Sequence, residues 1–202
     1  MRKVVVSEFI TLDGVIEDPG GGEGSKHAGW SFQFDTGTDG QRFKFDEVMR
    51  AGALLLGRVT YQGFAAAWPS MKDDAGFADK MNGMPKYVVS TTLEAAEWTN
   101  STLIRGDVAA EVARLKQQDG GEILINGSGQ LVRTLLGHDL IDEVRLMVFP
   151  IVLGSGKHLF DHIEAPAKLR LVDTTPVGPD GVLVLTYQPA PPSNETPTTS
   201  QP

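Results

Sequence analysis

A short apolar strand that ends in glycines and leads directly into a helix constrains the fold of this chain most strongly. Residues 123–125 form a continuous apolar run that stops at residues 126–129, Asn-Gly-Ser-Gly. A helical pattern follows at once, with Leu131, Leu135 and Leu136 on one side. Glycines let the backbone approach a ligand closely, and the first turn of a helix offers unpaired N–H groups. This arrangement can receive a phosphate, although the same turn also occurs where nothing binds.

A second sequence of strand, glycine and helix occurs earlier in the chain. The apolar residues 53–56 precede Gly57, and a helical pattern then continues to Trp68 and stops at Pro69. Arg58 stands at the turn, where its planar guanidinium would add charge and direction to the backbone donors for a phosphate. A surface salt bridge is the commoner role of a lone arginine, so both interpretations stay open on these residues alone.

Strands alternate with helices through about residue 140, and the C-terminal part is rich in strands. We expect strands at residues 4–9, 53–56, 85–92, 101–104, 123–125, 140–148, 168–173 and 182–187. We expect helices at residues 43–50, 57–68, 75–81 and 107–116, and directly after residue 129. This order predicts an α/β fold with a mostly parallel central sheet, helices on both faces and an antiparallel C-terminal edge.

Polar or glycine-containing segments follow directly after four of the expected strands. These segments are Asp13, Gly57-Arg58, Ser90-Thr91 and residues 127–129. The carboxyl ends of parallel strands share one edge of a sheet, so the segments predict a single extended cleft without naming its ligand. Two simpler interpretations stay open, because Asp-Gly is a standard turn signal and hydroxyls at a strand end often cap helices or form turns.

Residues 17–40 are glycine-rich and polar, which predicts a long loop of the kind that forms lids and binding loops. Trp30, Phe32 and Phe34 alternate within it, so we expect part of the loop to pack as a short extended piece over a pocket. The alternative is that these aromatic side chains pin the loop to the core, and the two interpretations are compatible.

Composition and length bound the function classes. We expect one domain at residues 1–188 and a disordered tail at residues 189–202, which are proline-rich and polar. A net charge of −8 argues against a nucleic-acid or membrane partner. The chain has no cysteine, which removes thiolate chemistry, and its histidines lack metal-ligand spacing, with His158 and His162 expected at the surface. No segment reads as a membrane span or signal peptide, so a cytoplasmic protein is expected.

Four blocks occur in a fixed order: residues 127–131 (GSGQL), 140–144 (LIDEV), 150–156 (PIVLGSG) and 159–160 (LF). Together they resemble the reductase domain of the bifunctional riboflavin-biosynthesis deaminase-reductase, and its stand-alone relatives in the dihydrofolate reductase-like superfamily. Residues 10–16 (ITLDGVI) resemble the S-L-D-G segment of that family's substrate site, with Thr11 in place of the usual serine. The resemblance covers most of residues 2–188, loosely at 17–45 and 70–84, and implies a three-layer dihydrofolate reductase-like fold.

The resemblance also implies an activity and a set of binding residues. It implies an NADPH-dependent reductase that transfers hydride to a pyrimidine- or pteridine-like substrate, similar to 5-amino-6-(5-phosphoribosylamino)uracil reductase. The deaminase domain and its zinc ligands are absent from this chain. The implied cofactor-binding residues are Gly57, Arg58, Thr60, Ser90, Thr91, Gly127, Ser128, Gly129, Gln130 and Leu131. The implied substrate-binding residues are Thr11, Asp13, Gly14 and Trp30.

Asp13 is the predicted catalytic residue, because a carboxyl can donate a proton at neutral pH if burial raises its pKa. Asp46 and Glu47 are further candidates, but they stand beside Lys44 and Arg50 in a polar helix segment, which favours a solvated face.

Two other functional interpretations stay open. The chain can be a non-catalytic protein of the same fold that binds NADPH or another small molecule, or an α/β domain whose glycine turns are only architectural. The resembled family commonly pairs subunits through its sheet edge, so a homodimer is expected, and the apolar residues 146–149 are compatible with it.

Overall fold

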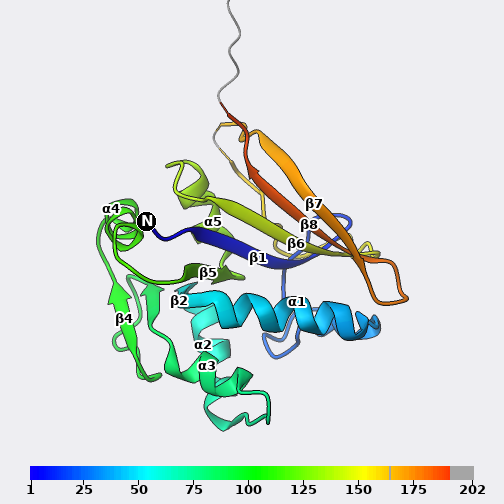
Figure 1. The fold of residues 1–202 in the computed structure, drawn as a ribbon, viewed down its shortest axis with the longest axis horizontal. Helices are drawn as coiled ribbons and strands as arrows, with labels where there is room; N and C mark the ends of the chain where they lie inside the picture. Colours follow the sequence, from blue (N-terminus) through cyan, green and yellow to red (C-terminus); the bar gives the residue numbers. More distant parts are fainter. Residues whose placement is uncertain (164, 192–202) are drawn as a thin grey trace, which may run out of the picture.

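An eight-stranded sheet runs through the chain, of which the computed structural model describes residues 1–163 and 165–191 (Figure 1). Its strand order is β4-β3-β2-β5-β1-β6-β8-β7. The strands from β4 to β6 are parallel to their neighbours, whereas β8 and β7 join antiparallel at one edge. The strands are β1 (Val4–Thr11), β2 (Ala51–Gly57), β3 (Lys86–Val89), β4 (Ser101–Ile104), β5 (Glu122–Asn126), β6 (Glu143–Phe149), β7 (Leu169–Val177) and β8 (Val182–Pro189). The predicted mostly parallel sheet with an antiparallel C-terminal edge is confirmed.

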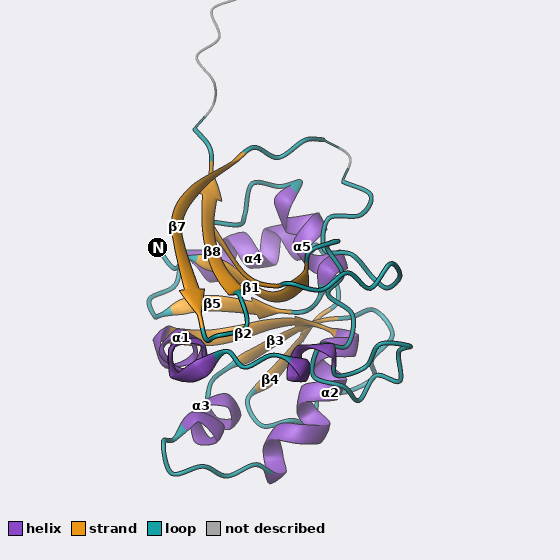
Figure 2. Ribbon diagram, turned by 90° about the vertical axis from the view of Figure 1, so that its right-hand side faces the viewer, coloured by secondary structure: helices purple, strands orange, loops and turns teal. Residues whose placement is uncertain are grey.

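Helices cover both faces of this sheet, which gives the predicted three layers (Figure 2). One face carries α1, α2 and α3, and the other carries α4 and α5. The α-helices are α1 (Gly37–Arg50), α2 (Arg58–Ala67), α3 (Phe77–Gly83), α4 (Val108–Lys116) and α5 (Gly129–Leu136), and the 3-10 helices are η1 (Trp30–Gln33) and η2 (Trp68–Ser70).

The strand β1 lies in the middle of the sheet, between β5 and β6, and is buried on both faces. Val4 and Val6 pack with residues of α4 and α5, whereas Val5 packs with residues of α1, α2 and α3. Successive side chains of a strand point to opposite faces, so only a continuous apolar run can fill both layers. The apolar run at the start of the chain therefore determines its central position.

The helix α1 begins at Gly37, inside the segment expected to be a loop, and six residues before the expected start at residue 43. Glycines at positions 37 and 40 hid this start because glycine is a poor helix former. The structure needs a small residue at Gly40, where an added Cβ would lie 2.6 Å from Thr36 Cβ. These glycines are explained by two close approaches. The start of the helix lies close to the turn before it, and Gly37 lies close to Gly178.

Two of the three aromatic residues of the expected loop pin it to the core. Trp30 is fully buried, and its ring meets the ring of Phe149 edge to face at 5.3 Å between centroids. Phe34 also packs on Phe149, whereas Phe32 is 77% exposed. Residues 30–33 form a 3-10 helix, so the prediction of an extended piece was wrong there, and the pinning alternative is what the structure shows.

The strand β8 continues to Pro189, one residue beyond the predicted domain end. The predicted disordered tail lies mostly at residues 192–202, outside the described residues. No helix in the described part of the chain is both long and apolar enough to cross a membrane. Within residues 1–163 and 165–191, no three or more histidine, aspartate or glutamate side chains gather as a metal site would require.

Candidate functional site

The two glycine turns lie side by side because β2 and β5 are neighbouring strands. Ser128 Oγ accepts the backbone N–H of Gly57 at 2.9 Å, and it also lies 3.2 Å from Thr60 Oγ1 and 3.1 Å from the Asn126 carbonyl oxygen. Gly127 has a left-handed backbone with φ +56, and an added Cβ would lie 2.6 Å from Thr60 Oγ1. The turns are thus built as one unit in which glycine is required at position 127.

A cavity of about 660 Å³ opens above both turns. This volume falls in the range of small-molecule and cofactor sites. The residues predicted to bind the cofactor all line it: Gly57, Arg58, Thr60, Ser90, Thr91, Gly127, Ser128, Gly129, Gln130 and Leu131. The structure therefore brings these residues together from three strand ends, as predicted, whereas their contact with a cofactor stays a prediction.

The start of α5 offers backbone donors to this cavity. The first hydrogen bond of the helix runs from Val132 N–H to the Ser128 carbonyl oxygen, so the N–H groups of residues 129–131 have no acceptor within the helix. The aligned peptide dipoles also make this end of the helix favourable for negative charge. Gly127 is different, because its N–H donates to Glu8 Oε2 at 3.0 Å and is not available to a ligand.

Arg58 and Ser90, which follow the strands β2 and β3, have distinct roles in the cavity lining. Arg58 Nη1 donates to Gln62 Oε1 at 2.8 Å, and no carboxylate pairs with Arg58 within the part of the chain that the structure describes. Its positive charge therefore remains available to an anion. The Ser90 hydroxyl accepts from the N–H groups of Thr92 and Leu93 at 3.2 and 2.9 Å, so this serine shapes the turn while Thr91 stays exposed.

Asp13 anchors a loop, and its role as the proton donor stays a prediction. Its carboxylate accepts from Thr11 Oγ1 at 2.5 Å, from Leu153 N–H at 3.2 Å and from Gly154 N–H at 2.7 Å. The hydrogen bond from Thr11, helped by those two amides, lowers the pKa of Asp13 to about 2. This direction is opposite to the raised pKa that a proton donor at neutral pH needs. Asp13 also lies outside the set of residues that line the cavity.

Two of the predicted substrate-binding side chains are buried, and their polar groups already form hydrogen bonds within the protein. Thr11 is 2% exposed, and its hydroxyl donates to Asp13 and accepts from Val15 N–H at 2.9 Å. The Trp30 indole N–H donates to the Glu17 carbonyl oxygen at 2.8 Å, and its ring is enclosed by the core. Neither side chain presents a surface to a ligand in this structure, and their roles in substrate binding stay predictions. The role of Gly14, which is partly exposed, stays a prediction.

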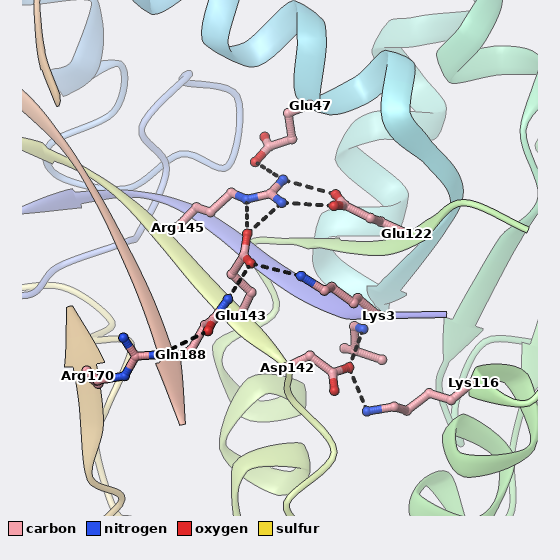
Figure 3. Close-up of polar contacts among 10 residues, drawn as sticks. Lys3, Glu47, Lys116, Glu122, Asp142, Glu143, Arg145, Arg170 and Gln188 are labelled. Carbon is pink, nitrogen blue, oxygen red and sulfur yellow. Dashed lines mark hydrogen bonds and ion pairs between the residues drawn. The ribbon is translucent and has the colours of Figure 1, made fainter. Parts of the chain in front are cut away.

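The prediction that Glu47 lies on a solvated face of α1 is wrong. This side chain is fully buried and accepts from Ser7 Oγ at 2.8 Å and from Lys44 Nζ at 2.5 Å. Arg145 lies 3.4 Å from its other oxygen and also contacts Glu122 and Glu143, as Figure 3 shows. The expectation holds for Asp46, which is half-exposed and lies 3.9 Å from Arg42. Neither acid lines the cavity.

Comparison with known proteins identifies the family. The model of the RibD C-terminal domain matches residues 2–183, which is nearly the whole described chain. The chain belongs to the RibD C-terminal domain family. The uncharacterized protein YwjB of Bacillus subtilis (strain 168) is 31% identical over 177 residues, which cover 88% of this chain and 93% of YwjB. The uncharacterized protein YyaP of the same organism is 26% identical over 189 residues, which cover 92% and 94% of the two chains.

Solved structures confirm the dihydrofolate reductase-like fold of this RibD C-terminal domain protein. A putative riboflavin biosynthesis protein from Shewanella sp. PV-4 superposes with a TM-score of 0.73 at 23% identity, covering 94% of this chain and 99% of its own. A Thermotoga maritima protein described as a deaminase and 5-amino-6-(5-phosphoribosylamino)uracil reductase gives 0.60 at 20% identity, covering 94% and 57%. Dihydrofolate reductase from Enterococcus faecalis, complexed with NADP(H), gives 0.58 at 16% identity, covering 93% and 96%.

Sequence reasoning missed several residues of the cavity in this RibD C-terminal domain protein. His158 and His162, expected only at the surface, line the cavity together with Arg133 and Lys157. Arg133 Nη1 donates to the carbonyl oxygens of His158 and Leu159, and so attaches the loop after β6 to α5. Lys157 and His158 stand between the matched blocks 150–156 and 159–160, and this position was the signal that could have located them.

Glu8 was missed as well, although it lies directly behind the glycine turn. It is 4% exposed on β1, with Oε2 bonded to Gly127 N–H and Oε1 without a partner in the described part of the chain. Burial raises the pKa of Glu8 well above its ordinary value, against the lowering effect of the Gly127 hydrogen bond. An acid inside an apolar central strand was the sequence signal for a special role.

Proposed function

We propose that this protein is an NADPH-dependent reductase that transfers hydride to a small heterocyclic substrate of the pyrimidine or pteridine kind, related to the riboflavin pathway. The observation that carries the proposal is the pair of glycine turns joined by Ser128, at the floor of one cavity that holds every predicted cofactor residue. Membership of the RibD C-terminal domain family supports it. The names of the Thermotoga and Enterococcus proteins, a reductase and a reductase complexed with NADP(H), support it further.

The residues of the cavity fit the phosphates of a dinucleotide. The N–H groups of residues 129–131 would face the pyrophosphate, where donors and helix dipole act together. Arg58, Thr60 and Thr91 stand at the end of the cavity near β2 and β3, where a guanidinium and hydroxyls suit the 2′-phosphate that distinguishes NADPH from NADH. Arg133 and Lys157 also line the cavity, and Lys157 is paired there with Glu17.

The chain itself supplies orientation and exclusion of water. NADPH, when bound, supplies the hydride, whereas the protein positions the reacting groups. Ser128 keeps the two turns at a fixed separation, and Asp13 fixes the loop after β1 to the loop after β6. Lys157 Nζ lies 2.6 Å from Glu17 Oε1, and both residues line the cavity. These contacts hold the loops that would surround a flat heterocycle.

A binding titration tests the proposal. We expect micromolar binding of NADPH, followed by nicotinamide fluorescence, and weaker binding of NADH. Arg58→Ala should weaken NADPH binding by about 10- to 150-fold, because a hydrogen bond to a charged group contributes about 1.5–3 kcal/mol. Arg114→Ala is the matched control, since Arg114 is an exposed arginine at the far end of α4, paired with Glu111. The control should bind as the wild type does.

The outcomes separate the candidate functions. Binding of neither nucleotide would sink the reductase proposal and leave the glycine turns as architecture. Binding of NADPH without its oxidation by any pyrimidine or pteridine substrate would favour the non-catalytic binding protein.

A homodimer stays a prediction for this protein. The edge strand β7 exposes Leu171 and Val172 by 49% and 45%, and an unprotected edge of this kind can pair with a second copy. Sedimentation equilibrium of the purified protein tests it, and a monomer at all concentrations would contradict it.

A further inference from the structure

Glu8 is a buried carboxyl that lies behind the glycine turn at Gly127. Along β1, side chains alternate between the two faces of the sheet, so Glu8 lies on the same face as Val6 and Ile10. Those two residues belong to the apolar cluster that contains Leu131 of α5. Glu8 thus sits among apolar side chains under the start of α5, one residue layer from the cavity.

The two oxygens of this carboxyl are in different situations. Oε2 accepts the N–H of Gly127 at 3.0 Å, and Gly127 lines the cavity. Oε1 is completely enclosed and has no partner among residues 1–163 and 165–191. An ionised carboxylate with a bare, enclosed oxygen is costly, whereas a neutral carboxylic acid is much less so. The surroundings therefore favour the neutral form.

The charged groups around Glu8 come from both faces of the sheet. Lys44 of α1 acts to lower the pKa of Glu8 and Glu47 of α1 acts to raise it, and both effects are smaller than the effect of burial. On the α5 side, the nearest charged side chain of the helix is Arg133, which is engaged with carbonyl oxygens of the loop after β6. No cation forms an ion pair with Glu8 in the described part of the chain.

We propose that Glu8 is a positioning residue of the cofactor cleft, which holds the Gly127 turn in place and whose neutral form favours the binding of an anion at the start of α5. The inference rests on the proposed function, since it assumes that phosphate groups occupy that end of the helix. Gly127 is two residues from Gly129, where α5 begins, so a bound phosphate and an ionised Glu8 would share one turn. Two negative charges at that separation repel each other strongly in a protein.

Binding and protonation are then coupled in both directions. A phosphate at α5 raises the pKa of Glu8, and ionisation of Glu8 weakens the binding of the phosphate by the same factor. We expect roughly a tenfold loss of affinity as Glu8 ionises, from a repulsion between unit charges several ångströms apart. The loss appears as pH rises, because Glu8 is neutral below its raised pKa and ionised above it.

The test compares NADP⁺ affinity from pH 5 to pH 9, by calorimetry, in the wild type and in Glu8→Gln. Glutamine keeps the shape and can still accept the Gly127 N–H, but it cannot ionise. Titration of the ligand's own phosphates affects both proteins equally, so the ratio of the two affinities isolates the effect of Glu8. We expect equal affinities at low pH and about tenfold tighter binding by Glu8→Gln at high pH. Glu8→Ala, which lacks the acceptor, should bind more weakly at every pH.

A failure of the proposal for Glu8 can be distinguished from a failure of the proposed function. Parallel pH profiles for wild type and Glu8→Gln would overturn the role of Glu8 and leave the proposed function standing. If the wild type binds no NADP⁺, the proposed function fails, and inorganic pyrophosphate, which needs only the start of α5, tests Glu8 by the same comparison. If Glu8→Gln does not fold, ¹³C carboxyl NMR of the wild type replaces it. A Glu8 pKa that does not rise on pyrophosphate binding would then overturn the inference.

Discussion

Ser128 Oγ accepts the backbone N–H of Gly57 at 2.9 Å, so a single hydroxyl joins two turns that lie 71 residues apart in the chain. Ser128 itself has a left-handed backbone with φ +63, which few residues other than glycine adopt readily. The serine is therefore kept in an unfavourable conformation for the sake of its hydroxyl. The contacts of this one side chain explain why the two helix starts share one cavity.

Ser128→Gly should weaken NADPH binding although it relieves the left-handed backbone. Removing the hydroxyl leaves the part-buried Gly57 N–H without its acceptor, which costs about 0.5–1.5 kcal/mol, and the turns lose their fixed separation. Ser128→Ala should be less stable than Ser128→Gly, because alanine keeps the strain without the hydrogen bond. Urea unfolding and NADPH titration measure both effects. Ser70→Ala, which removes an exposed hydroxyl, is the control and should change neither.

Gly127→Ala should destabilise the protein by roughly 1–3 kcal/mol, since it strains a left-handed position. It also brings Cβ to 2.6 Å from Thr60 Oγ1. The double variant Gly127→Ala, Thr60→Ala should recover the stability lost to the Thr60 contact but not the stability lost to backbone strain. A double-mutant cycle separates these two contributions to the free energy of unfolding. Gly63→Ala is the matched control. It lies inside α2 in open space, so alanine there should stabilise by about 0.5–1 kcal/mol. Strictly additive losses would show that Thr60 does not confine Gly127.

Lys86→Met should lower the free energy of unfolding without changing cofactor affinity. The Lys86 ammonium is fully buried and donates to the carbonyl oxygens of Asn82, Met84 and Thr99 at 2.6, 2.9 and 2.9 Å. It also lies 4.1 Å from the centre of the Trp98 ring. Leaving these carbonyls without donors costs about 1–3 kcal/mol each if no water replaces the lysine. Urea unfolding measures the loss, with the exposed Lys72→Met as control. An unchanged midpoint would contradict the structural role.

Asp13→Asn should reduce stability at neutral pH, and the difference from wild type should shrink in acid. The folded-state pKa of about 2 lies below the ordinary value of 3.8. A depressed pKa gives stability that is fully present above pH 4 and is lost as pH falls toward 2. Urea unfolding of both proteins between pH 7 and pH 3 measures the difference. A turnover number that falls to zero in Asp13→Asn, with stability unchanged, would contradict the anchoring role and support Asp13 as the proton donor.

The parts of this site that could be predicted from sequence are those with local signals. Both glycine turns follow an apolar strand and precede a helical pattern, so their shared edge followed from the topology of parallel sheets. The start of α1 could not be predicted, because glycine at positions 37 and 40 lowers the helix propensity of this segment. The structure requires glycine there because Gly178 lies close to Gly37 and Thr36 lies close to Gly40. Only tertiary packing reveals that requirement.

The roles of the acids were the least predictable part. Glu47 reads as solvated from its polar neighbours in the sequence, but its partner Arg145 comes from a strand 98 residues later. The carboxylate of Asp13 accepts from amides 140 and 141 residues away, in addition to the hydrogen bond from nearby Thr11 that lowers its pKa most. Glu8 owes its raised pKa to burial by distant elements. Protonation depends on such long-range neighbours, so local sequence patterns could not assign the proton donor.

The central position of β1 has a consequence for synthesis on the ribosome. Val4 pairs with Ile123, and Val5 pairs with Glu143, so the first strand made can pair only when the strands β5 and β6 have been made. At about 5–20 residues per second, translation needs roughly 6–30 s to produce that part of the chain. During this interval the nascent apolar segment Val4–Thr11 has no partner strand, so its apolar side chains and backbone edges are open to non-native contacts.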